Sequence, residues 1–139
     1  DGQHDPADIP RFIEAYVRTG IPVLIGNRMA EQEKMPLVRR LTNRYMSWLL
    51  SRKMKQYVPD SQCGYRLYRC DVLSFTATQS SGFAAESEVL MILASRGIRM
   101  DSVPIAAIYG DEQSKIHPVR DTIRFFSMLR QCEKKLGRR

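Results

Sequence analysis

Arginine and lysine side chains occupy positions from which they can bind a phosphate group. Arg28 directly follows a short apolar run, Arg40 and Arg44 lie on a long basic segment, and Lys115 lies in a polar stretch near the end of the chain. A guanidinium group matches the geometry of phosphate oxygens with paired hydrogen bonds. These residues indicate a phosphorylated partner, although a single arginine on a helix is more often a solvated surface charge.

Two carboxylates are candidates for acid–base chemistry. Asp60 and Arg66 flank Gly64, so they can form a loop that contacts a sugar or an acceptor, or an internal ion pair that fixes the turn. Glu86 lies near the start of a predicted helix, where the helix dipole already favours a carboxylate. Either carboxylate can serve as the base in a reaction with a hydroxyl nucleophile.

The composition is that of a folded domain with an anionic partner. The 139 residues are enough to bury a core, and 22 Lys and Arg against 15 Asp and Glu give a net charge of +7. This charge favours nucleic acid, a phosphorylated small molecule or an acidic membrane surface. No apolar run is long enough to span a membrane. The cysteines lack metal-ligand spacing, so we expect free thiols in a reducing compartment at Cys63, Cys70 and Cys132.

Helices alternate with short strands along the sequence, which predicts an α/β fold. Asp5 and Pro6 predict the start of a helix that Gly20 ends. A buried strand over 22–26 then places Arg28 beyond its carboxyl end, where open α/β sheets bind ligands. The remaining expected elements are a helix from Pro36 to Tyr57 ended by Pro59, a strand over 64–69, a helix from Ala84 to Arg96, an edge strand within 98–109 and a last helix from Pro118.

Two of the predicted helices carry apolar stripes. The helix over 36–57 has an apolar stripe and a basic opposite face, which fits either a helix at a membrane surface or a core helix with a charged outer side. Its stripe is Leu37, Leu41, Tyr45, Trp48 and Leu49, widened by Met46, Leu50, Met54 and Tyr57. Its basic residues are Arg39, Arg40, Arg44, Arg52, Lys53 and Lys55. On the last helix, Ile123, Phe126 and Leu129 are spaced as a buried stripe.

Five short motifs follow one another along the chain: Asp1 to Pro6, Gly26-Asn27-Arg28, Asp60 to Tyr68, Phe83 with Glu86 and Glu88, and Ser114-Lys115-Ile116. Their order resembles that of family-2 glycosyltransferases of the dolichyl-phosphate mannosyltransferase type. The segment Asp1 to Pro6 resembles the stretch that begins at the second Asp of that family's Asp-x-Asp-x-Gln metal motif. Gly26-Asn27-Arg28 resembles its Gly-Ser-Arg segment, and Asp60 to Tyr68 resembles its Asp-x-x-x-Gly-Phe-Arg block. The other two motifs are Phe83 with Glu86 and Glu88, which resemble a Phe-x-x-Glu element, and Ser114-Lys115-Ile116, which resembles a Ser-Lys loop. Tyr109 stands where mannosyl-type relatives often carry Arg, which leaves the sugar open.

The resemblance implies a GT-A fold, here its acceptor-side part with a mixed sheet and flanking helices, together with a divalent metal and inverting chemistry. Residues 1–139 would then form part of one domain whose nucleotide-binding N-terminal half is missing, and this piece is expected to be inactive alone. Asp1 would bind Mg²⁺ or Mn²⁺, and Gln3 would contact the donor diphosphate. The implied acceptor and phosphate contacts are Arg28, Arg40, Arg66, Ser114 and Lys115, and the catalytic carboxylates are Asp60 and Glu86.

The resulting hypothesis is a glycosyltransferase that moves a sugar from a nucleotide sugar to a polyprenyl phosphate, peripherally bound at the cytoplasmic face of a membrane. A phosphate acceptor is largely dianionic at neutral pH, so it needs positioning more than a base. A transferase of the same fold that acts on a saccharide or protein hydroxyl is one alternative. A basic nucleic-acid-binding module is another, but the basic residues are spread over several elements, so no nucleic-acid partner is expected.

Overall fold

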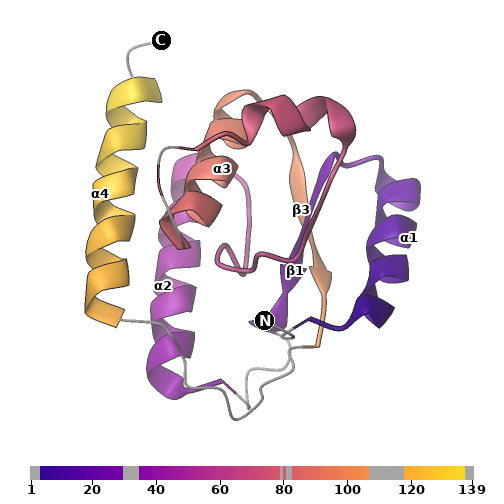
Figure 1. Ribbon diagram of the computed structural model, residues 1–139, viewed down its shortest axis with the longest axis horizontal. Coiled ribbons are helices and arrows are strands. Elements are labelled where there is room, and N and C mark those ends of the chain that lie inside the picture. Colours follow the sequence, from indigo (N-terminus) through magenta and orange to yellow (C-terminus); the bar gives the residue numbers. More distant parts are fainter. Residues whose placement is uncertain (1–3, 30–34, 79, 81–82, 107–117, 137–139) are drawn as a thin grey trace.

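The computed structural model describes residues 4–29, 35–78, 80, 83–106 and 118–136. In chain order its elements are the 3-10 helix η1 (Pro6–Asp8), α1 (Ile9–Thr19), β1 (Val23–Asn27), α2 (Leu37–Met54), β2 (Arg66–Tyr68), the 3-10 helix η3 (Cys70–Phe75), α3 (Phe83–Ser95), β3 (Met100–Pro104) and α4 (Pro118–Leu136). α1 lies on one side of the sheet, and α2, α3 and α4 lie on the other (Figure 1). This arrangement confirms the predicted α/β fold with a mixed sheet and flanking helices.

The three strands form a sheet in the order β2-β1-β3, with β1 in the centre. β1 pairs with β2 in antiparallel fashion, with Ile25 opposite Arg66, and with β3 in parallel fashion, with Asn27 opposite Pro104. β1 is apolar on both faces because both are covered, and Val23, Leu24 and Ile25 are at most 1% exposed. The predicted strands are thus confirmed, and proline stands on an outer strand as expected.

Gly26 lets three segments meet at the end of β1. A Cβ added at this position would lie 2.6 Å from Ile105 Cδ1 and 3.0 Å from Cys63 Sγ. The Gly26 amide donates to the Tyr65 carbonyl at 2.8 Å. The absence of a side chain therefore brings the loop after residue 60 directly against the central strand.

The ends of the first helical segment agree with the prediction. The Asp5 side chain accepts a hydrogen bond from the Ala7 amide at 2.9 Å, and Pro6 begins η1. Gly20 ends α1 in the left-handed conformation, with φ of 65°. These signals are local in the sequence, which is why the sequence predicts them well.

α2 buries only one edge of the predicted apolar stripe, namely Met46, Leu50 and Met54, and it ends earlier than predicted. The buried residues are Asn43, Met46, Ser47, Leu50 and Met54. Four residues of the predicted apolar stripe, namely Leu37, Leu41, Tyr45 and Trp48, are each more than half exposed. Lys55, in the left-handed conformation with φ of 54°, ends the helix before Tyr57 and Pro59 are reached. The prediction is therefore confirmed for Met46, Leu50 and Met54 and wrong for the four exposed residues, because the buried face also includes the polar residues Asn43 and Ser47.

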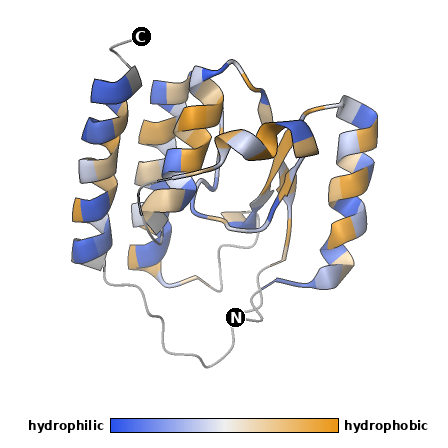
Figure 2. Cartoon of the chain, turned by 45° about the horizontal axis from the view of Figure 1, so that its top comes forward, coloured by the Kyte–Doolittle hydropathy of each residue, from blue (hydrophilic) through white to orange (hydrophobic). Residues whose placement is uncertain are grey.

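α3 and α4 complete the far side of the sheet. α3 is apolar around most of its surface because it lies against both the core and α4, and Leu90 and Leu93 are fully buried. Figure 2 shows that apolar residues gather in the sheet and α3, whereas the outer face of α4 is hydrophilic. α4 buries Phe125, Met128, Leu129 and Cys132, so the predicted stripe is wrong for Ile123, 64% exposed, and for Phe126, 36% exposed.

Two predictions about the whole chain can be compared with the structure. Cys63, Cys70 and Cys132 are free thiols, as expected. Across the described ranges, no helix has both the length and the apolar character required to cross a bilayer.

Candidate functional site

A buried ion pair joins the end of β1 to the loop that begins at residue 60. Arg28 Nε and Nη2 donate to the two carboxylate oxygens of Asp60 at 2.7 and 2.9 Å, and the Arg28 amide donates at 3.2 Å. Arg28 is 5% exposed and Asp60 is fully buried. Burial raises the pKa of the Asp60 carboxyl, but the hydrogen bonds and charge of Arg28 outweigh it and hold that pKa below its ordinary value.

The polar face of α2 completes this ion pair. Asn43 Nδ2 donates to Asp60 Oδ1 at 2.8 Å, and the Ser47 hydroxyl donates to Asn43 Oδ1 at 3.0 Å. The Ser61 amide then donates to the Ser47 hydroxyl at 2.9 Å. Buried polar groups require such partners, so this network explains why α2 turns Asn43 and Ser47 inward.

Arg66 holds the loop from residue 60 together and ties it to α3. Its guanidinium donates to the backbone carbonyls of Cys63 at 2.8 Å, Ser61 at 2.9 Å and Glu86 at 3.0 Å. It also forms an ion pair with the Glu86 carboxylate, with Nη1 3.1 Å from Oε2. The Arg66 side chain is 1% exposed, so in this structure its guanidinium is buried and makes structural contacts within the protein.

Glu86 is the accessible carboxylate of the site. Its side chain is 39% exposed, in contrast to the fully buried Asp60. Glu86 Oε1 would lie 3.6 Å from a Cβ placed on Gly64, so the carboxylate stands beside the exposed glycine of the loop. This glycine leaves room for a ligand group next to a fixed carboxylate.

The internal ion pairs differ from the expected one. The sequence suggested that Asp60 and Arg66 can pair with each other across Gly64. In the structure Asp60 pairs with Arg28, and Arg66 pairs with Glu86. Arg66 is fixed opposite Ile25 by the antiparallel register of β2, whereas Arg28 lies beyond the end of β1, where Asp60 reaches it.

His4 attaches the start of the described chain to the same loop. Its imidazole stacks on the Tyr65 ring, with centroids 4.8 Å apart, and the Tyr65 hydroxyl donates to the Asp5 carbonyl at 3.1 Å. His4 Nδ1 is buried without a hydrogen-bond partner among the described residues. Burial and the nearby Arg28 charge lower the pKa of His4, which favours the neutral ring. Sequence reasoning missed this stacking, because His4 and Tyr65 are distant in the sequence and no local pattern joins them.

Among the predicted site residues that the structure describes, Arg40 is not joined to this cluster. Arg40 lies half-buried in the first turn of α2, where its amide donates to the Pro36 carbonyl at 3.0 Å. Four predicted residues lie outside the described residues, namely Asp1, Gln3, Ser114 and Lys115. Within the part of the chain that the structure describes, no three His, Cys, Asp or Glu side chains are grouped as metal ligands.

The fold and the site together define an α/β protein in which one buried and one half-buried ion pair fix a loop at the carboxyl end of the central strand. The chain is 30% identical, over 78% of its length, to the UDP-N-acetylglucosamine–dolichyl-phosphate N-acetylglucosaminyltransferase of Methanococcus voltae, of which it covers 45%. It is 28% identical to two uncharacterized proteins of Methanocaldococcus jannaschii. These are MJ1222, matched over 78% of this chain and 47% of the relative, and MJ0544, matched over 81% and 50%.

These comparisons make the chain a distant homologue of a glycosyltransferase. They support a distant family relationship between this chain and transferases of the polyprenyl-phosphate type. The chain spans about half the length of the curated relatives it matches. No family model matches the chain, and no solved structure is detectably similar to it.

Proposed function

We propose that this chain is the acceptor-side part of a family-2 glycosyltransferase with a GT-A fold, which moves a sugar from a nucleotide sugar to a polyprenyl phosphate with inversion. The observation that carries the proposal is the similarity to the Methanococcus voltae enzyme, whose name states a nucleotide-sugar donor and a dolichyl-phosphate acceptor. The five sequence motifs agree with it. Because the chain spans about half of its relatives, we assign nucleotide binding to the remainder of a longer protein, and we expect residues 1–139 to be inactive alone.

In this proposal the first ion pair positions the acceptor phosphate. Asp60 fixes the plane of the Arg28 guanidinium at the carboxyl end of β1, and we assign Arg28 the contact with the acceptor phosphate there. Asp60 itself is fully buried, and both its oxygens accept hydrogen bonds, so we assign it a positioning role rather than that of a base. Arg40, Ser114 and Lys115 stay candidates for further phosphate contacts.

The second ion pair positions Glu86 beside the loop. Arg66 orients the Glu86 carboxylate and holds the loop around Gly64, so its role in our proposal is also to position other groups. A dianionic phosphate attacks the sugar without a general base, and Glu86 then contributes by orienting the acceptor or the sugar. A second candidate function, transfer to a saccharide or protein hydroxyl, is favoured by the exposure of this carboxylate, which is suitably placed for a base.

We propose Asp1 as a ligand of Mg²⁺ or Mn²⁺ and Gln3 as a contact of the donor diphosphate. Carboxylate and amide oxygens are the donor type that these ions prefer. When bound, such an ion neutralises charge on the departing nucleotide diphosphate. The stacking of His4 on Tyr65 ties the segment that follows these two residues to the Asp60 loop, which supports a shared site.

We further propose that the protein is peripheral at the cytoplasmic face of a membrane. The net charge of +7 and the exposed residues Leu37, Leu41, Tyr45 and Trp48 of α2 support contact with an anionic bilayer. No nucleic-acid partner is proposed.

The test uses the full-length protein that contains this chain, together with labelled nucleotide sugars, a polyprenyl phosphate and Mn²⁺. We expect label in the organic phase, and we expect a chelator to abolish it. Metal-dependent hydrolysis of the donor without lipid labelling would refute the lipid acceptor and keep the glycosyltransferase. A folded protein that shows neither reaction would refute the proposed function altogether.

A further inference from the structure

We propose that a cationic pocket on the C-terminal half of α2 binds the phosphate headgroup of an anionic membrane phospholipid. The pocket is separate from the ion pairs described above, and it names the surface and the lipid class through which the protein attaches to the bilayer. The inference rests on the peripheral membrane location put forward under the proposed function.

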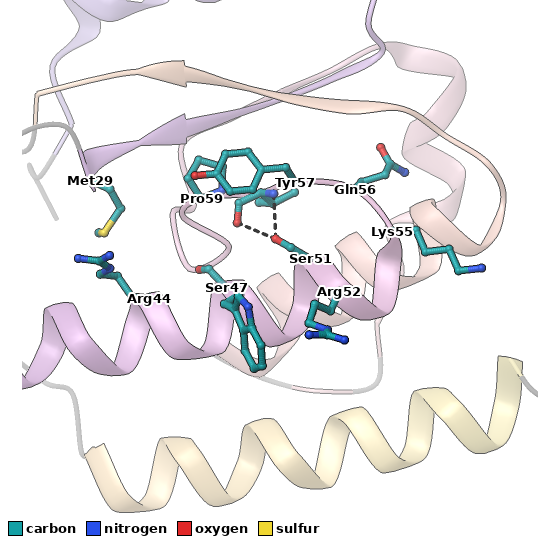
Figure 3. A pocket seen from close by; sticks show the side chains of 11 residues that line it. Met29, Arg44, Ser47, Ser51, Arg52, Lys55, Gln56, Tyr57 and Pro59 are labelled. Atoms are coloured by element: carbon teal, nitrogen blue, oxygen red, sulfur yellow. Dashed lines mark hydrogen bonds between the residues drawn. The ribbon is translucent and has the colours of Figure 1, made fainter.

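The pocket lies between α2 and the turn that follows it, and its volume is about 550 Å³. Arg44, Trp48 and Arg52 line it from α2, and Lys55 and Tyr57 line it from the turn. Figure 3 shows Arg44 and Met29 pointing toward one another at one end, with Lys55 at the other. Cationic groups therefore lie at both ends of a single hollow.

The described charged residues that line the pocket are all positively charged. Among the described residues that line it there are three cations, Arg44, Arg52 and Lys55, and neither Asp nor Glu. None of the three belongs to the ion pairs found in the described part of the chain, whereas their neighbour Lys53 pairs with Glu133. The end of α2 contributes roughly half a negative charge, which three unit charges exceed. The pocket therefore attracts an anion.

Aromatic and apolar residues next to these cations favour a phosphate attached to an apolar chain. Trp48 and Tyr57 are 53% and 80% exposed. Tyr45 stacks on Trp48, with ring centroids 6.1 Å apart, and the Arg52 guanidinium lies 5.3 Å from the Trp48 centroid. Tyrosine and tryptophan prefer the headgroup level of a bilayer, where one part of the ring is apolar and the other is hydrated. Leu41 continues this apolar surface one helical turn further.

The wall of the pocket is fixed before any ligand arrives. The Ser51 hydroxyl accepts from the Val58 amide at 2.9 Å and donates to the Val58 carbonyl at 3.2 Å (Figure 3). The Gln56 side chain donates to the Ile98 carbonyl at 3.0 Å and accepts from the Met100 amide at 2.9 Å. These bonds hold the turn that carries Lys55 and Tyr57, so little ordering is needed when a headgroup binds.

The pocket also adjoins the candidate site. Ser47 is one of its lining residues and donates to Asn43, which in turn donates to Asp60. A headgroup in the pocket therefore places the bilayer surface one helical turn away from the network that orients Arg28.

The chain offers a direct optical probe for this pocket, because Trp48 is its single tryptophan. The experiment measures Trp48 fluorescence during titration with vesicles of phosphatidylcholine and phosphatidylglycerol in equal amounts, and with vesicles of phosphatidylcholine alone. We expect a blue shift with the first vesicles and not with the second. The variant Arg44→Gln/Lys55→Asn removes two charges and keeps a residue that tolerates the left-handed conformation at position 55.

The control is Arg11→Gln/Arg18→Gln, which removes the same formal charge from exposed positions on α1, on the opposite side of the sheet, and also breaks the Arg11–Asp8 ion pair. We expect the pocket variant to bind the anionic vesicles about 30-fold more weakly. The control is expected to lose less than about threefold, because distant charges are screened. Equal losses in the two variants, or an unchanged Trp48 spectrum, would overturn the proposal.

Two further measurements separate the possible explanations. If soluble glycerol 1-phosphate shifts the Trp48 spectrum at the same phosphate concentration as the vesicles, the pocket binds free phosphate and the lipid proposal is overturned. Sugar transfer by the full-length protein to polyprenyl phosphate in detergent needs no bilayer. If the protein binds the anionic vesicles but transfers no sugar, only the proposed function is refuted. If it transfers sugar but does not bind the vesicles, only the lipid pocket is refuted.

Discussion

Replacing Asp60 by asparagine is expected to destabilise the protein strongly, because it breaks the buried ion pair with Arg28. The substitution keeps the shape of the side chain but removes its charge. Asp60 accepts hydrogen bonds from the Arg28 amide, Nε and Nη2 and from Asn43 Nδ2. An asparagine amide group in either orientation directs N–H groups at two of these donors. Arg28, 5% exposed, then loses the carboxylate charge of Asp60 from its buried surroundings.

The expected loss is about 3–5 kcal/mol of unfolding free energy, as for other buried pairs that lose one partner. With a urea m-value of about 2 kcal/mol/M, the unfolding midpoint followed by circular dichroism falls by about 2 M. The matched control is Asp71→Asn, which breaks the pair of Asp71 with Arg69 on the surface, at 2.6 Å but with both side chains about half exposed. This control is expected to change the midpoint little.

The pH dependence provides an independent check of the same pair. The pKa of Asp60 is lower in the folded protein than its ordinary value of 3.8, so the unfolded chain takes up a proton first as the pH falls. The stability from the pair is complete above pH 3.8 and is lost as the pH falls through the lower folded-state pKa. The midpoint difference between the wild type and Asp60→Asn is therefore expected to shrink in this range. A constant difference, or an equal effect of Asp71→Asn, would refute the reasoning.

Three further predictions test other parts of the structure. Gly26→Ala is expected to lower the unfolding free energy measured in urea by about 1–3 kcal/mol, because its Cβ would lie 2.6 Å from Ile105 Cδ1. Gly64→Ala, whose nearest contact is at 3.6 Å, is expected to change it little. Glu86→Gln in the full-length protein is expected to reduce transfer to polyprenyl phosphate only severalfold, and a loss of about 10²–10⁴ would instead identify a base acting on a hydroxyl. The His4 imidazole is expected to titrate below 6.5 by NMR, so its contribution to stability decreases as the pH falls below 6.5, and His4→Phe, which retains an aromatic ring on Tyr65, is expected to remove that dependence.

The elements with local signals could be predicted from the sequence. Asp5, Pro6 and Gly20 delimit the first helical segment, and Pro118 begins α4, because caps and proline act on the few residues next to them. The position of Arg28 beyond the central strand followed from the apolar run before it.

The buried faces of α2 and α4 could be predicted only in part, at Met46, Leu50, Met54 and Leu129. Asn43 and Ser47 are polar, and they turn inward only because Asp60 and Ser61, distant in the sequence, supply their partners. On α4, Phe125 and Phe126 are adjacent, and packing against α3 decides which of them is buried. The pairing of Asp60 with Arg28 depends on the same long-range contacts.

The single guanidinium of Arg66 has a mechanical consequence. Its hydrogen bonds connect the loop carbonyls of Ser61 and Cys63 to the Glu86 carbonyl in the first turn of α3. A loop without regular secondary structure is thereby attached to a helix. The ammonium group of a lysine has its donors on one atom and cannot span these acceptors. The loop and α3 are therefore expected to move as one rigid body, and any displacement at Gly64 would reach α4 through the α3–α4 contact.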